Sequence, residues 1–284
     1  MNLRAALRGI VRRGPRDILR ESNRLRGGNH LYLWMLASNM RAHNPLTFVE
    51  ESDNQAVWFT EFPALIKLNG GRVRITDRRH LRLGQGFDSD FTREELISFC
   101  SSHLLSSPSF RCRLSRARDA LLPGTLTVNV RRGDYYGTRH EPEFGMRIVP
   151  YVEHAVGIHA NRGEVSRVQL VSDDLSWCEN HLASPLRALG VTETSFSRLG
   201  TSMMDDLATL AASRRLVLAN STFSYWGAYL ATVLGTTTSD VVAPAFHQKA
   251  FGDATPWFHD PQWSLVRSLP GGWQAPSAQA HPAS

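Results

Sequence analysis

Residues 206–230, "DLATLAASRRLVLANSTFSYWGAYL", contain the strand-and-helix pattern that decides the fold. A stretch of small and apolar residues with helical spacing ends near Ser213, and the continuous apolar run 216–219 follows it. The polar loop 220–224 then leads into a second apolar helix. A short, wholly apolar run between two helices is typical of a buried parallel strand. This stretch therefore predicts a helix, a central strand and a second helix, with a polar loop where the strand ends.

The same rhythm continues on both sides of this stretch. Strands are expected at 125–130, 167–172 and 240–244, with helices at 150–160 and 173–183 between them. Strand and helix alternation predicts the α/β class, with a parallel sheet covered on both faces and ligands bound beyond the carboxyl ends of its strands. In the N-terminal part we expect a helix at 31–42, short strands at 45–50 and 70–77, and a helix that begins with a capping box of Thr92 and Glu95. No convincing strand precedes Gly27.

The charge of the chain is concentrated at its N-terminus. Residues 1–27 contain eight arginines, one aspartate and one glutamate, so they carry the whole net charge of +6. The remainder is neutral, which argues against a nucleic-acid partner. The arginines recur at four-residue spacing beside Leu3, Leu7 and Val11, so an arm at residues 1–26 is either solvated or in peripheral contact with an anionic membrane. Three cysteines without CxxC spacing and no long apolar run predict a cytoplasmic protein.

Polar residues follow three of the predicted strands. They are Arg131, Arg132 and Asp134 after the first, Ser172, Asp173 and Asp174 after the second, and Asn220, Ser221 and Thr222 after the third. Gly133, between Arg132 and Asp134, indicates that a ligand or another backbone comes close there. Arginine forks fit phosphate groups, and the amino end of a helix binds anions. The alternatives are a structural Arg–Asp pair at the first strand end and ordinary helix capping at the other two. Together the three loops predict a diphosphate site.

Two other motifs resemble metal sites without supporting one. The "DSD" at 88–90 directly precedes the capping box, so we interpret it as a loop and helix start. The "HEPEF" at 140–144 has no second histidine at ligand spacing. Trp226 and Tyr229 are three residues apart on the last helix, and this spacing indicates core positions.

Three segments resemble glycosyltransferase family 11, the α-1,2-fucosyltransferases. They are "NVRRGDYY", "SDDLSWCEN" and "DLATLAASRRLVLANSTFSYWGAYL", in the order that the family has them. The family's N-terminal glycine-rich element corresponds to "GGNHLYLWMLA", which keeps Gly28 and Asn29. The chain departs from the family at Asn129, where the family has histidine, and at Tyr225, where it has tryptophan. The resemblance covers roughly residues 27–250 and is strong after residue 125.

This resemblance implies a GT-B-like fold with two Rossmann-type halves. The implied domains are the arm 1–26, an acceptor-side domain 27–122, a GDP-sugar-binding domain 123–270 with the parallel sheet, and a loose tail 271–284. Carried over by position, Arg131 clamps the diphosphate, Asp206 faces the guanine, and Asn29 lies on the acceptor side. Asn129, Arg132, Ser172, Asp173, Asn220, Ser221 and Thr222 complete the expected substrate site.

The implied reaction is an inverting transfer of fucose from GDP-fucose to a hydroxyl of a glycan acceptor, the 2-hydroxyl of a galactoside. No metal or other cofactor is expected, because arginine and helix N–H groups can stabilise the departing GDP. Asp134, Glu141 and Glu143 are candidates for the base. The alternative is a non-catalytic protein that binds a nucleotide sugar or a glycan. Such an enzyme would modify lipid-linked or surface glycans, which are assembled at the inner face of a membrane.

Overall fold

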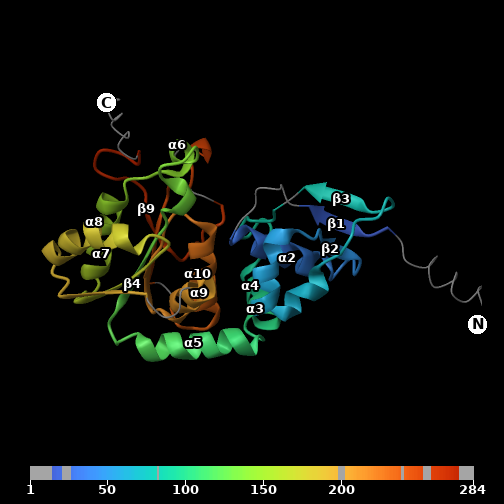
Figure 1. Cartoon of the computed structure of the whole chain (residues 1–284), viewed down its shortest axis with the longest axis horizontal. Helices are drawn as coiled ribbons and strands as arrows, with labels where there is room; N and C mark the ends of the chain where they lie inside the picture. Colours follow the sequence, from blue (N-terminus) through green and yellow to red (C-terminus); the bar gives the residue numbers. More distant parts are fainter. Residues whose placement is uncertain are drawn as a thin grey trace, which may run out of the picture. The chain divides into compact units, whose positions relative to one another are not determined.

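The computed structural model describes residues 15–20, 27–81, 83–197, 202–237, 240–251 and 257–274. The chain divides into two compact units, 1–112 and 113–284, which are described separately below (Figure 1). The boundary falls within helix α5 (Pro108–Ala120), and the boundary expected at 122/123 lies just beyond the end of this helix. Most of the expected arm, residues 1–14 and 21–26, lies outside the described residues, as does 275–284 of the expected tail.

The N-terminal unit contains a small parallel sheet in the order β2-β1-β3. Its strands are β1 (Asp17–Arg20), β2 (Thr47–Val49) and β3 (Arg78–Leu81). The helices are α2 (Asn29–Met40), α3 (Ala56–Glu61) and α4 (Arg93–Phe99), with short helical segments at Asp53–Gln55, Pro63–Leu68 and Cys100–Leu104. Helix α2 is buried from His30 to Ala37, and its Trp34 packs against Trp58. The capping box of Thr92 and Glu95 is confirmed.

Strand β1 corrects the expectation that residues 1–26 form an arm and that no strand precedes Gly27. Ile18 and Leu19 are completely buried, and β1 pairs with strands on both sides. Arg16 ties the start of this strand to Asp77 through an ion pair of 2.6 Å. The strand is missed because only two apolar residues stand between arginines, too few for any periodicity. Its partners, β2 and β3, supply the burial from distant parts of the sequence.

The C-terminal unit has a six-stranded parallel sheet in the order β6-β5-β4-β7-β8-β9. The strands are β4 (Leu126–Val130), β5 (Arg167–Ser172), β6 (Glu193–Phe196), β7 (Arg215–Val217), β8 (Val241–Pro244) and β9 (Ser264–Val266). Counted from β4, this is the order 3-2-1-4-5-6 of the dinucleotide-binding Rossmann fold. The prediction of an α/β chain is confirmed, as is the parallel sheet of the C-terminal half, which has the Rossmann strand order.

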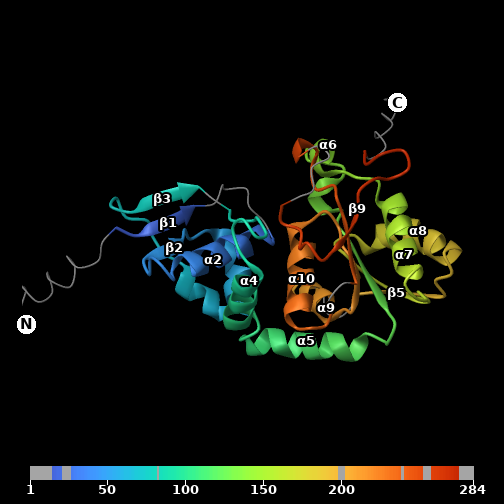
Figure 2. The ribbon, with the colours of Figure 1, turned by 180° about the vertical axis from the view of Figure 1, so that it is seen from behind.

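Helices cover both faces of this sheet. α7 (Ile148–Ala160) and α8 (Leu175–Ala188) lie on one face, and α9 (Met203–Ala212) and α10 (Thr222–Val233) lie on the other (Figures 1 and 2). Two short elements, Gly133–Tyr135 and α6 (Glu141–Phe144), follow β4, and Lys249–Phe251 follows β8. Trp226 and Tyr229 of α10 are fully buried, which confirms their expected place in the core.

Three further features differ from the sequence prediction. β6 and β9 were not expected, because neither has a continuous apolar run. The strand expected at 70–77 lies instead at Arg78–Leu81, and Ile75 is fully exposed. The expected tail 271–284 begins later than predicted, because Trp273 stacks on Phe246 at 5.7 Å and joins the core of the unit.

Candidate functional site

The site begins where β4 and β5 end side by side. Val130 of β4 is in register with Ser172 of β5, so the next two residues of each chain segment also stand next to each other. Accordingly, Arg131 pairs with Asp173 at 2.6 Å and Arg132 pairs with Asp174 at 3.1 Å. The two arginines and the two aspartates therefore continue the strand pairing as a ladder of ion pairs at the carboxyl edge of the sheet.

Arg131 is held by two carboxylates. Its Nη1 contacts Asp173 and its Nη2 donates to Asp134 Oδ1, each at 2.6 Å. Burial disfavours the charged guanidinium, but the two carboxylates outweigh burial and raise the pKa of Arg131. These contacts use two of the five N–H groups of a guanidinium. About a third of the side chain, 35%, remains exposed, so Arg131 is both fixed and accessible.

Gly133 makes this arrangement possible. Its φ is +21°, and a Cβ placed there would collide with the Oδ2 of Asp173 and press on the guanidinium carbon of Arg131. The glycine was expected to mark a close approach of a ligand or of another backbone. The group that approaches it in the structure is the carboxylate of Asp173.

Arg132 has a different environment from its neighbour. Its guanidinium carbon lies 4.6 Å from the ring centre of Tyr136 and 4.3 Å from that of Trp177. Its Nε donates to Asp174, which also caps α8 by accepting from the backbone N of Trp177 at 3.0 Å. Stacking and pairing at this side chain fix the loop to α8. Arg132 therefore holds the site together, and Arg131 is the more available cation.

At the second strand end, Asp173 and Asp174 make different contacts. Ser172 Oγ accepts from the backbone N of Asp174, and Asp174 is the cap of α8. Asp173 accepts from the backbone N of Arg132 at 2.8 Å in addition to its ion pair with Arg131. The capping alternative therefore holds for Asp174. Asp173, the other, contacts the first strand end.

Asn129 is buried within β4 and joins three elements. Its Nδ2 donates to the carbonyl of Val171 at 2.9 Å, and its Oδ1 accepts from the Oγ of Ser224 in α10. Ser224 is completely buried. The amide thus links β4 to β5 and to the first turn of α10, directly beneath the arginine ladder.

The third strand end lies at the start of α10. Asn220 donates to the carbonyls of Phe144 and His247, at 2.8 and 3.0 Å, and so ties α6 and the loop after β8 to this point. Ser221 is the N-cap residue of α10, but its side chain makes no capping hydrogen bond. Thr222 begins the helix. The first N–H groups of an α-helix have no partner within the helix, so this end favours an anion.

Two adjacent aspartates at the start of α9 have separate surroundings. Asp205 accepts from Ser202, the N-cap residue of α9, at 2.7 Å and from Arg113 at 2.5 Å, and the contact with Arg113 attaches α9 to α5. Asp206 has a pKa raised to about 6 because burial disfavours its charge, and the carboxylates of Asp205 and Asp173 add to the effect. Asp206 is therefore electrostatically coupled to the same carboxylate that holds Arg131.

The three candidates for a base lie after β4. Asp134 is ion-paired with Arg131. Glu141 Oε2 accepts from the backbone N of Gly137, and Glu143 Oε1 accepts from the backbone N of Ala250. Only Asp134 contacts the arginine ladder directly, whereas both glutamates stabilise the backbone around α6.

Asn29 belongs to the other unit. It is the first residue of α2, and its Oδ1 accepts from Gln85 Nε2 at 2.7 Å. The structure thus brings together Arg131, Arg132, Asp134, Asp173 and Asp206 in one unit. Asn29 is described only within its own unit.

The sequence did not single out the aromatic residues of the site. Tyr135 stacks on Phe144 at 4.8 Å, and Tyr136 accepts from the backbone N of Met146 while donating to its carbonyl. Burial raises the pKa of Tyr136 to about 12, so its hydroxyl stays protonated. Their position directly after "RRGD" was the available signal.

Two observations concern metal ions and membranes. Within the described ranges, no three histidine, cysteine, aspartate or glutamate side chains are grouped so that they could hold a metal ion. No helix in these ranges combines the length and the apolar character needed to cross a membrane.

Comparison with known proteins decides the family. The model of the family "Glycosyl transferase family 11" matches residues 114–263, more than half of the chain. The chain belongs to glycosyl transferase family 11. The matched residues include every part of the site in the C-terminal unit, so the family resemblance of the three strand-end motifs is confirmed.

The chain also matches individual known proteins over part of its length. The "O-antigen biosynthesis glycosyltransferase WbnK" of Escherichia coli is 32% identical over 112 residues, which are 38% of this chain and 35% of that protein. The chain thus matches about a third of the length of this curated relative. Among solved structures, POFUT1 in complex with GDP has a TM-score of 0.40 at 11% identity, covering 67% of this chain and 59% of POFUT1. A mutant of Arabidopsis thaliana FUT1 in complex with GDP has a TM-score of 0.39 at 12% identity, covering 80% and 72%. At these TM-scores, residues of this chain cannot be matched with individual residues of those two structures.

Proposed function

We propose that this family 11 chain is an inverting glycosyltransferase that moves fucose from GDP-fucose to a hydroxyl of a glycan, the 2-hydroxyl of a galactoside. The observation that carries the proposal is Arg131, an accessible guanidinium fixed by two carboxylates within the part that matches the family. The strand order of a dinucleotide-binding fold supports a nucleotide at this sheet edge. The names of two of the structural relatives include GDP, which accords with this donor.

In the proposed reaction the bond between C1 of fucose and the β-phosphate oxygen breaks, and its electron pair stays on GDP. Arg131 and the N–H groups at the start of α10 stabilise the added negative charge, as an oxyanion hole does. An acceptor hydroxyl forms the new bond to C1 from the opposite face, which inverts the anomeric carbon. Its proton passes to a carboxylate, with Asp134, Glu141 and Glu143 as the candidates.

In this proposal the remaining site residues bind the substrates or position other residues of the site. Asp206 accepts from guanine in its ionised form, and Ser221 and Thr222 donate to phosphate oxygens. Asn129 and Arg132 act indirectly, because their contacts fix the strand end and the loop that carry Arg131. Asn29 is proposed to contact the acceptor.

The test is the release of GDP from GDP-fucose with a panel of glycan acceptors, with and without a chelator. Arg131→Ala is expected to lower kcat/KM about 100-fold, equivalent to roughly 3 kcal/mol of transition-state stabilisation. Arg167→Ala is the matched control, because it removes another ion-paired arginine, Arg167 with Glu193 at 2.9 Å, from the opposite end of β5. Arg131→Ala activity within a few-fold of the control would refute the clamp. GDP binding without turnover on any acceptor would favour a non-catalytic binding protein, and complete loss of activity with the chelator would refute metal independence.

A further inference from the structure

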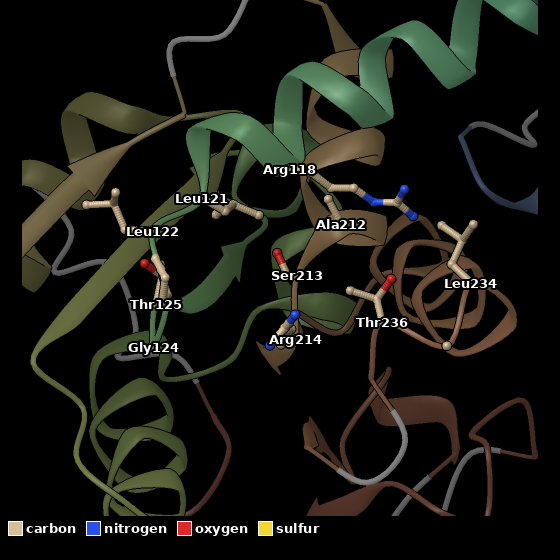
Figure 3. A pocket seen from close by; sticks show the side chains of 12 residues that line it. Arg118, Leu121, Leu122, Gly124, Thr125, Ala212, Ser213, Arg214, Leu234 and Thr236 are labelled. Carbon is tan, nitrogen blue, oxygen red and sulfur yellow. The ribbon is translucent and has the colours of Figure 1, made fainter.

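The C-terminal unit has a hollow at the edge of its sheet opposite to the candidate functional site. Its volume is about 650 Å³, within the range of small-molecule sites. Gly124 and Thr125, directly before β4, and Ser213 and Arg214, directly before β7, contribute to its wall (Figure 3). Because these residues precede parallel strands, the hollow lies at the amino ends of the strands. The candidate functional site lies at their carboxyl ends, so the two are separate.

The polar lining of this hollow is cationic. Arg118, in the last turn of α5, and Arg214 both line it, and none of the lining residues is acidic. In the part of the chain that the structure describes, neither guanidinium has an ion pair or hydrogen bond. Arg113 on the same helix, in contrast, is paired with Asp205. Thr125 and Thr236 add hydroxyl groups to the wall. Two arginines with no carboxylate between them favour a ligand with a double negative charge, such as a phosphate.

The rest of the wall is apolar. Leu121, Leu122 and Leu234 line the hollow together with Pro123 and Ala212. Leu122 is 50% exposed, although large apolar side chains gain free energy when water is removed from them. A free inorganic phosphate would leave this surface wet. A ligand with an apolar group beside its phosphate would cover it.

We propose that this hollow binds a phosphate ester that carries an apolar group, with Arg118 and Arg214 holding the phosphate and the leucines contacting the apolar group. The ester is either a soluble molecule or the headgroup region of a lipid, and both offer the same chemistry. The site is distinct from the proposed donor site and does not depend on it.

The probe is octyl phosphate below its micelle concentration, with binding measured by calorimetry. Wild-type protein is expected to bind octyl phosphate at least about tenfold more tightly than inorganic phosphate, and Arg118→Gln with Arg214→Gln is expected to lower this affinity at least about tenfold. Leu122→Asn should weaken octyl phosphate binding and leave inorganic phosphate binding unchanged. Arg111→Gln is the matched control, because Arg111 is exposed on the same helix and does not line the hollow. Thermal unfolding of each variant checks that the fold is kept.

Saturating GDP separates the two sites. Octyl phosphate binding that persists with GDP present, and that the double variant loses, supports the proposal whether or not GDP-fucose is turned over. Binding to phosphatidic acid vesicles that also needs the two arginines identifies a lipid source, and its absence identifies a soluble ester. The proposal is overturned if octyl phosphate does not bind, if the double variant binds it as tightly as wild type does, or if GDP displaces it.

Discussion

Replacing Gly133 with alanine tests whether the arginine ladder controls activity. The new Cβ would occupy the space of the Asp173 carboxylate, so either Asp173 or Arg131 must move. Gly137→Ala is the matched control four residues away. Gly137 has φ +66°, and a Cβ there meets nothing within 4 Å. Both variants strain the backbone, but only Gly133→Ala also disturbs the ion pairs.

The expected magnitudes follow from these contacts. An alanine at positive φ costs roughly 1–2 kcal/mol of stability, and this is the whole cost expected for Gly137→Ala. Displacing Asp173 also breaks its hydrogen bond from the Arg132 backbone N and its ion pair with Arg131. The ion pair is partly screened, since its side chains are 35% and 28% exposed. We therefore expect Gly133→Ala to lower the free energy of unfolding by about 2 kcal/mol more than the control does.

The effect on activity should be larger than the effect on stability. A displacement of about 1 Å in a positioned catalytic group can cost roughly 100-fold in rate. We expect kcat/KM for GDP release from GDP-fucose to fall about that much in Gly133→Ala and only a few-fold in Gly137→Ala. Urea unfolding gives the stabilities, and assays well below the unfolding midpoint give the rates. If the two variants lose stability and activity equally, the close packing of Gly133 against Asp173 has no functional role.

Three further predictions concern other parts of the chain. Asp206 has a pKa of about 6 in the folded protein, above its usual 3.8, so burying its charge costs stability, and this stability is regained as pH falls from 7 to 5. Over the same pH range the affinity for GDP should fall. Urea unfolding and calorimetry measure the two trends, and Asp206→Asn should show neither. Asn129→Ala leaves Ser224 and the carbonyl of Val171 without their partner and should lower the free energy of unfolding by about 2 kcal/mol. A double variant with Ser224→Ala should lose less stability than the sum of the two single losses. Strict additivity would show that the two side chains are not coupled. Deleting residues 1–14 should abolish salt-sensitive co-sedimentation with anionic vesicles and leave GDP affinity unchanged. If neither the full-length nor the truncated protein sediments with the vesicles at low salt, these residues do not bind membranes. The deletion stops there because Arg16 and β1 belong to the folded unit.

The C-terminal unit was predictable because its central strands are buried on both faces. The runs "LVLA" at 216–219 and "VVAP" at 241–244 are continuous in apolar character, and the first has a helix on either side in sequence. β1 and β3 lack such a signal. All four residues of β3 are exposed, and its strand conformation comes from pairing with β1, which lies about sixty residues earlier in the sequence. Pairing between distant segments leaves no local periodicity.

The site was predictable as a set of loops but not as a set of contacts. Sheet topology places the ends of parallel strands at one edge, and this brings "RRGD" beside "SDD" without any structural model. Which arginine meets which aspartate depends on the register of Val130 with Ser172, and the sequence does not contain that information. The same limit explains Asn129, which looked like a ligand-facing residue. Both ends of its amide are bonded to neighbouring elements.

The pair of adjacent arginines has a physical explanation in this register. Arg132 contacts two rings and is paired with a helix-capping aspartate, so moving it would disturb α8 and the loop together. Arg131 is paired with two carboxylates and lies 5.6 Å from the ring centre of Tyr135, and in the proposed function a diphosphate replaces the carboxylates with oxygens of the same charge and similar geometry. In this proposal Asp134 and Asp173 keep the guanidinium in place and charged, and they give up their contacts when a phosphate binds. One arginine alone could not be both a fixed anchor of the loop and an exchangeable partner for a ligand.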